Sequence, residues 1–154
     1  MKLIAEIASD AAKLVCMLAP LAIGLAVYAP NADAQSPVVI DGDMGGVLAD
    51  YALRAGQYRR DNRRVEILGA CGSACTVFIG LPGACIGPHA SVLMHAAYER
   101  GTGKTLPWAT AMIVASYPLK LQQWVAAHGG LTAEIMTLGP DDMRGILPEC
   151  GRKA

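Results

Sequence analysis

The residues best suited to chemistry are a serine and a histidine that each follow an apolar segment. Ser73 lies within Gly69–Thr76 (GACGSACT), directly after the expected strand Arg64–Leu68. His95 ends a second apolar segment, Ser91–His95 (SVLMH). A serine hydroxyl on a tight turn between a strand and a helix, with an imidazole brought alongside by the next strand, is the usual construction of a serine nucleophile. The pair therefore predicts a hydrolase or a protein that descends from one.

A glycine-rich turn offers candidate donors for an oxyanion. Asp41–Gly46 (DGDMGG) separates an expected strand, Val38–Ile40, from an amphipathic helix expected over Val47–Arg60. Amide N–H groups at the start of a helix point outward and bind anions, although glycine is also the default residue of a tight turn. Because the carboxyl ends of neighbouring parallel strands meet at one edge of a sheet, we expect this turn to lie beside Ser73.

The rest of the chain alternates between apolar strands and helices. Strand–helix–strand order implies parallel strands joined by right-handed crossovers, so the sequence predicts an α/β domain. The further expected elements are a short helix over Ser73–Leu81, strands over Ala84–Ile86 and Ser91–His95, a long helix over Leu106–Ala127 with a kink at Pro118, and a short helix with an irregular tail in Leu131–Ala154.

The start of the chain reads as an export signal. Leu14–Ala29 is an apolar run, and Ala32–Ala34 (ADA) has the small residues of a signal-peptidase site, with Gln35 as the expected first mature residue. The run is also nearly long enough for an uncleaved anchor. We therefore expect a signal peptide or N-terminal anchor over residues 1–34 and one folded domain over 35–154, periplasmic or secreted and free of the membrane after cleavage.

Four cysteines remain after the expected leader: Cys71, Cys75, Cys85 and Cys150. An even number in an oxidising compartment favours disulfides, and four cysteines allow three connectivities. A bridge between Cys71 and Cys75 would brace the serine turn, and the alternative is a Cys85–Cys150 bridge beside two buried thiols. A zinc site is disfavoured because the paired, closely spaced cysteines of a zinc ribbon are missing, and no metal or cofactor is expected.

Charge gives no sign of a nucleic-acid partner, since 13 lysine and arginine residues balance 13 aspartate and glutamate residues. The arginines Arg59, Arg60, Arg63 and Arg64 are interpreted as the solvated end of a helix. Gly101–Thr105 (GTGKT) imitates part of a phosphate-binding loop without its first glycine, and we interpret it as a lid near the site.

Three of these motifs together resemble the Clp serine protease and crotonase superfamily. They are Asp43–Val47, Cys71–Cys75 and Ser91–His95, and the likeness is greatest to an exported bacterial branch with a Cys-x-Ser-Ala-Cys box. The resemblance covers Val38–His95 well and the remainder loosely. It implies stacked β-α-β units with mostly parallel strands, shortened at the N-terminus, and a homo-oligomer.

The same resemblance implies a role for each site residue. Ser73 would be the nucleophile and His95 the general base, while the amides of Gly46 and Ala74 would form the oxyanion hole. The candidates for the carboxylate that orients the imidazole lie in the tail. They are Asp142, with Asp141 as the alternative and Glu134 behind them.

The predicted function is thus an exported serine hydrolase, most simply a peptidase acting on peptides or proteins through an acyl-enzyme at Ser73. The alternative is a catalytically inactive protein of the same fold that binds a partner in the cell envelope. A third interpretation is thiol chemistry at Cys71 and Cys75.

Overall fold

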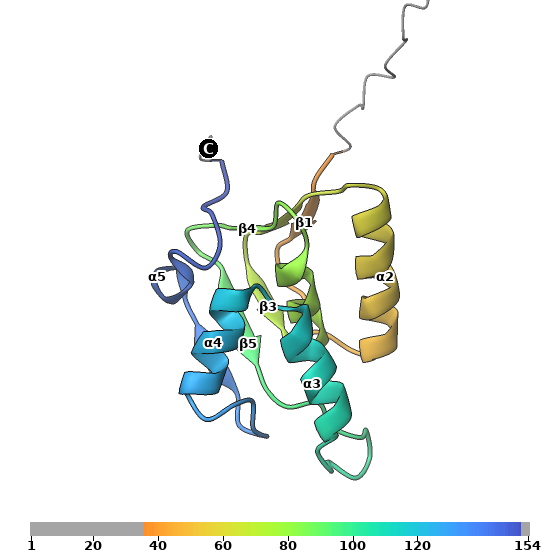
Figure 1. Ribbon diagram of the computed structural model, residues 1–154. Coiled ribbons are helices and arrows are strands. Elements are labelled where there is room, and N and C mark those ends of the chain that lie inside the picture. Colours follow the sequence, from red (N-terminus) through yellow and green to blue (C-terminus); the bar gives the residue numbers. More distant parts are fainter. Residues whose placement is uncertain (1–35, 152–154) are drawn as a thin grey trace, which may run out of the picture. The chain divides into compact units, whose positions relative to one another are not determined.

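The computed structural model describes residues 36–151, so the expected leader over residues 1–34 lies outside the described part of the chain. The described residues have a mixed α/β fold in which two small sheets carry helices on either side (Figure 1). The α/β prediction is confirmed at this level. One sheet is wholly parallel and the other contains an antiparallel strand, β6 (Met136–Leu138).

Each sheet has three strands. The first has the order β1-β2-β4 and the second the order β3-β5-β6, with β3 parallel to β5 and β5 antiparallel to β6. Every strand in the described residues is only two to four residues long, so side chains from the helices supply much of the core. The bounds are β1 (Val38–Ile40), β2 (Val65–Ile67), β3 (Ala70–Gly72), β4 (Cys85–Ile86) and β5 (Ser91–Met94).

The chain crosses from the first sheet to the second within a few residues after β2. The Ile40 carbonyl accepts the amides of both Leu68 and Gly69, at 2.8 and 3.1 Å, which ends one sheet and begins the next. A Cβ on Gly69 would lie 2.8 Å from the Asp41 carbonyl group, so only glycine fits this crossing. As a result Ser73 follows β3 in the second sheet, not the strand Arg64–Leu68 from which it was expected to emerge.

The helices match the predicted positions with one correction. The expected single helix over Leu106–Ala127 is two helices, α3 (Pro107–Ser116) and α4 (Leu119–Ala127). Pro118 brings no amide hydrogen and pushes the preceding residue toward extended backbone, and Tyr117 accordingly has φ −76° and ψ 157°. The remaining helices are α2 (Leu48–Arg60), the 3₁₀ helix η2 (Ser73–Gly80) and the short α5 (Pro140–Met143).

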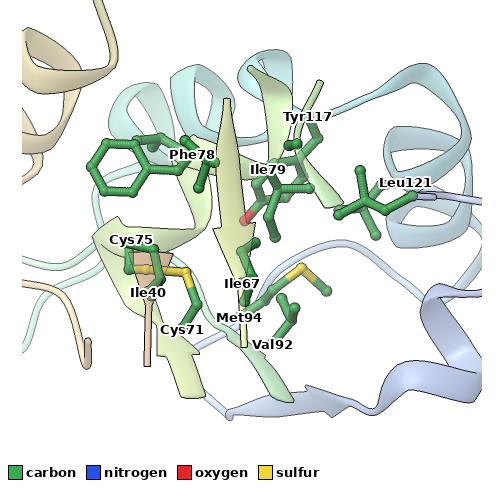
Figure 2. Packing of buried hydrophobic residues seen from close by; sticks show 14 of the residues in the cluster. Ile40, Ile67, Cys71, Cys75, Phe78, Ile79, Val92, Met94, Tyr117 and Leu121 are labelled. Carbon is green, nitrogen blue, oxygen red and sulfur yellow. A yellow bond between two sulfur atoms is a disulfide. The ribbon is translucent and has the colours of Figure 1, made fainter. Parts of the chain in front are cut away.

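Helix η2 runs through the centre of the core. Six consecutive residues, Ala74–Ile79, are buried, because strands, α2 and α3 surround this helix. The Phe78 ring lies 5.5 Å from the rings of both Tyr51 and Tyr58 of α2. Figure 2 shows Phe78 and Ile79 above the strand residue Ile67 in the same cluster. The helix that begins with the candidate nucleophile is therefore fixed on all sides.

Two disulfides complete the domain. Cys71 bridges Cys75 with a Cα–Cα distance of 5.4 Å, and Cys85 bridges Cys150 at 5.0 Å (the first is drawn in Figure 2). The prediction of disulfides is confirmed, with both pairs formed. Such bridges persist in oxidising compartments, so they fit a protein outside the cytoplasm. No helix within residues 36–151 is long and apolar enough to cross a bilayer.

Candidate active site

Four of the predicted site residues line one pocket of about 650 Å³ in the described part of the chain. Ser73, Ala74, Gly46 and His95 all line it. The sheet explains why, because β3 and β5 are parallel neighbours with Gly72 paired to Leu93. Ser73 and His95 therefore follow the carboxyl ends of adjacent strands, which lie about 4.8 Å apart.

Ser73 has an unusual backbone conformation. Its φ is +53°, in the left-handed region that residues with a Cβ rarely adopt. Such a conformation costs about 1–3 kcal/mol and persists only where the surroundings enforce it. A serine in a strained turn between a strand and a helix presents its hydroxyl away from the backbone, as a nucleophile requires.

Two sets of contacts enforce the serine turn. The Cys71–Cys75 disulfide closes a loop whose central residue is Ser73. The Ser73 carbonyl accepts a hydrogen bond from Thr76 Oγ1 at 2.7 Å, and the Tyr117 hydroxyl lies 2.7 Å from the same Oγ1. Because Thr76 donates its proton to the carbonyl, Tyr117 is the donor to Thr76. Burial raises the pKa of Tyr117 to about 12, which keeps this donor protonated.

The glycine turn lies directly against Ser73. A Cβ on Gly45 would lie 2.6 Å from Gly72 O, 2.7 Å from Ala74 N and 2.8 Å from Ser73 Cβ. Ala74 lies in the first turn of η2, where amides have no acceptor within the helix, and within residues 36–151 we find no other acceptor for its amide or for that of Gly46. Both residues line the pocket. Two free amides beside a serine hydroxyl are the donor set that an oxyanion hole needs.

His95 has a defined tautomer. Its Nδ1 lies 2.7 Å from the carbonyl oxygen of Ala96, and a carbonyl only accepts hydrogen bonds. In the neutral ring Nδ1 therefore carries the hydrogen, and Nε2 has the lone pair that a general base uses. The ring also packs against that of Tyr98, with centres 5.5 Å apart. Ser73 and His95 share no hydrogen bond in the described structure, and such contacts often form only with substrate bound.

The candidate carboxylates of the tail do not reach this pocket. In the antiparallel pairing Val92 opposes Leu138 and Met94 opposes Met136, so the chain after Leu138 runs away from His95. Asp142 accepts the Gly139 amide at 2.8 Å and caps α5.

The other two acids are no closer to the imidazole. Asp141 pairs with Arg144 at the surface. Glu134 lies before β6, nearer to His95 in register, but its side chain is exposed and it is not part of the pocket wall. The structure thus brings four of the predicted residues together and leaves the predicted acids elsewhere.

The pocket wall is largely apolar. Met44, Val47, Trp108 and Ile135 line it and remain half or more exposed, at 61%, 50%, 66% and 61%. The predicted lid is a hairpin in which Tyr98 bridges Thr105 and the Glu99 amide donates to the Lys104 carbonyl at 2.8 Å. Tyr98, Glu99 and Arg100 of this hairpin line the pocket, whereas none of the predicted lid residues 101–105 does.

Several residues that support the site were not predicted from the sequence. Asp43, Tyr51, Thr76 and Tyr117 hold the two turns, and the Ala96 carbonyl orients His95. Only Asp43 gave a readable signal, because an aspartate two residues before a glycine is typical of an Asx turn.

Comparisons of the chain with protein-family models, with curated proteins and with solved structures find no match. Within residues 36–151 no group of three or more histidine, cysteine, aspartate or glutamate side chains is arranged to hold a metal ion. The function is therefore inferred from the geometry of the pocket.

Proposed function

We propose that this protein is an exported serine hydrolase, with Ser73 as the nucleophile and His95 as the general base. The observation that carries the proposal is the left-handed Ser73, which lines one pocket with two free amides and an imidazole of the required tautomer. Strain at a residue with a reactive side chain is the kind of outlier that marks functional sites.

The chemistry follows from these groups. Ser73 Oγ attacks a carbonyl carbon of the substrate while His95 Nε2 takes the hydroxyl proton. The oxyanion of the tetrahedral intermediate accepts hydrogen bonds from the amides of Gly46 and Ala74, each worth about 3 kcal/mol of transition-state stabilisation. His95 then gives its proton to the leaving group, and water attacks the acyl-enzyme with His95 again as base.

The catalytic unit proposed here is a dyad held by a backbone carbonyl. In a triad the carboxylate fixes the tautomer of the histidine and stabilises its cation. The Ala96 carbonyl supplies the first of these effects through its 2.7 Å hydrogen bond, and only a partial charge for the second. We therefore expect a slower enzyme than a triad would give, with no contribution from Asp141 or Asp142.

We extend the proposal to the superfamily, the substrate, the oligomeric state and the location of the protein. The glycine turn, the Ser73 box and His95 follow one another along parallel strands, in the order that the Clp protease and crotonase superfamily uses. A peptide or protein substrate, a homo-oligomer and a periplasmic or secreted location are the corresponding expectations. The two disulfides support the location.

A fluorophosphonate probe tests the proposal. The oxidised protein, expressed with its own leader, should be labelled covalently, and Ser73→Ala should abolish labelling without unfolding the domain. His95→Asn should slow labelling strongly, because Ser73 then lacks a base. A wild-type protein that takes no label, while its circular dichroism shows it folded, refutes the hydrolase.

The second candidate is an inactive protein of the same fold that binds a partner in the cell envelope. The observation in its favour is the half-exposed apolar wall formed by Met44, Val47, Trp108 and Ile135, because such surface on a monomer often marks a binding site. An unlabelled protein whose tryptophan fluorescence shifts with an apolar peptide, and does so no longer in Trp108→Ala, would support this candidate.

A further inference from the structure

Asp43 precedes the two glycines of the turn and joins three parts of the site through its carboxylate and its backbone. Its Oδ1 accepts a hydrogen bond from the Gly45 amide at 2.8 Å and another from the Tyr51 hydroxyl at 2.5 Å. Its backbone pairs with β3, since the Asp43 amide donates to Ala70 O at 2.8 Å and the Gly72 amide donates to Asp43 O at 2.7 Å. One residue therefore connects the strand that leads to Ser73, the turn beside it and helix α2.

Tyr51 makes this connection rigid. The residue is 7% exposed, and its ring packs 5.5 Å from that of Phe78, in the helix that begins with Ser73. The Arg54 guanidinium lies 4.0 Å from the centre of the same ring. Burial, followed by the hydrogen bond to Asp43, raises the pKa of Tyr51, so the phenol stays protonated and continues to donate.

The hydrogen bond from Gly45 to Asp43 decides which amide of the turn is free, and the Tyr51 hydroxyl holds the same carboxylate in place. Gly45 gives its amide to the carboxylate, and the next amide, that of Gly46, is left without an acceptor at the pocket. Gly45 also has the φ of +81° that the turn requires, with Ser73 Cβ and Ala74 N against it. A shift of the turn would thus move the Gly46 amide relative to the serine hydroxyl.

We infer that Asp43, supported by Tyr51, is a positioning residue that holds the Gly46 amide on the oxyanion site. The inference rests on the proposed function, because it assigns a role within the same reaction. Asp43 touches no reacting atom and acts only through the glycine turn. Its effect should appear in the rate of the chemical step more than in substrate affinity, since the oxyanion forms only as bonds change.

The test uses the labelling kinetics of the fluorophosphonate, whose phosphoryl oxygen occupies the oxyanion site. Removing an oxyanion donor outright costs about 10²- to 10³-fold in rate, and a displaced donor retains part of its effect, so Asp43→Ala should slow labelling about 10- to 100-fold. The loss should fall on the maximal labelling rate, with little change in the probe concentration that gives half of it. Tyr51→Phe removes one of the two hydrogen bonds and should give a smaller loss.

Two further variants separate positioning from a general loss of structure. Asp43→Asn keeps an oxygen that can accept both hydrogen bonds, so it should recover most of the rate. Asp50→Ala removes an exposed acid from the first turn of α2, the helix that contains Tyr51. Asp50 lies outside the pocket, so this variant should label at the wild-type rate. If Asp43→Ala fails to fold, Tyr51→Phe and Asp43→Asn carry the comparison.

The outcomes are distinct. Slow labelling of folded Asp43→Ala or Tyr51→Phe, with recovery in Asp43→Asn, supports the inference. Wild-type labelling rates in every folded Asp43 and Tyr51 variant overturn it while the hydrolase stands. An unlabelled wild-type protein is a failure of the proposed function itself.

Discussion

The substitution Gly45→Ala is the most direct test of how the glycine turn packs against Ser73. Gly45 has φ +81°, and a new Cβ would meet Gly72 O at 2.6 Å, Ala74 N at 2.7 Å and Ser73 Cβ at 2.8 Å. Two of these atoms are backbone, and Ser73 is fixed by the Cys71–Cys75 disulfide, so none of them can move easily. The left-handed backbone costs an alanine about 1–2 kcal/mol, and the overlap adds about 1–3 kcal/mol.

Gly145→Ala is the matched control for this substitution. Gly145 has the same φ of +81°, and nothing lies within 4 Å of the Cβ it would carry. Both variants therefore have the same unfavourable backbone conformation, and only Gly45→Ala adds the steric overlap. The difference between their free energies of unfolding should be about 1–3 kcal/mol, measured by urea unfolding at equal slopes.

The two variants should also differ in activity. Gly45→Ala should lose fluorophosphonate labelling, because its methyl group displaces either the turn or the serine, whereas Gly145→Ala should label normally. Equal free energies of unfolding for the two variants, or normal labelling of Gly45→Ala, would contradict the close packing of the glycine turn against Ser73.

Three further predictions concern the disulfides, a buried tyrosine and the acid of the tail. The Cys85–Cys150 bridge spans 65 residues and the Cys71–Cys75 bridge spans four. Because the longer loop restricts the unfolded chain more, Cys150→Ser should lower the free energy of unfolding by about 4 kcal/mol and Cys75→Ser by about 2 kcal/mol, measured in urea. A larger loss in Cys75→Ser than in Cys150→Ser would refute this chain-entropy explanation. Burial raises the pKa of Tyr117 from 10.0 to about 12, so its contribution to stability is complete below pH 10 and is lost as the pH rises toward 12. Between pH 10 and 12 the free energy of unfolding should therefore fall by about 2–3 kcal/mol less in Tyr117→Phe than in the wild-type protein. The same fall in both proteins would show that the phenol does not titrate in this range. Asp142→Ala should lose about 1 kcal/mol through the cap of α5 while labelling continues at the wild-type rate, and a large drop in labelling would restore the triad.

The elements that the sequence predicted well are those with a clear apolar pattern. The helix expected over Val47–Arg60 is α2, Leu48–Arg60, and the strand expected over Ser91–His95 is β5, Ser91–Met94. Such differences of one residue are ordinary at the ends of elements. His95 and Ser73 line the same pocket, as expected, but the strand that leads to the serine is β3, which pairs with β5, and not the predicted strand Arg64–Leu68.

The elements that were missed have too little pattern to be seen. Strand β3 is Ala70–Gly72 (ACG) and strand β6 is Met136–Leu138 (MTL), each three residues long. Alanine and glycine have low strand propensity, and three residues do not establish an alternation. The separation into two sheets depends on the short crossing between β2 and β3, and it was missed because β3 itself was not recognised.

The predicted carboxylate partner of His95 could not be settled from the sequence, because it depends on the direction of β6. A parallel β6 would have carried the chain after Leu138 toward His95, whereas the antiparallel pairing carries Asp142 away. The Ala96 carbonyl that accepts the hydrogen bond from His95 Nδ1 has no sequence signature at all, because every residue has a carbonyl. Orientation by backbone is therefore found only in the folded structure.

The contacts around Ser73 all act to hold its strained backbone conformation. A left-handed serine costs about 1–3 kcal/mol, and glycine would take the same backbone without that cost. The strain is instead opposed by a disulfide across the turn, by the Thr76 hydroxyl on the Ser73 carbonyl and by the buried Tyr117 behind Thr76. These contacts converge on one hydroxyl-bearing residue at the edge of the pocket, and the proposed use of its hydroxyl would explain why the strain is kept.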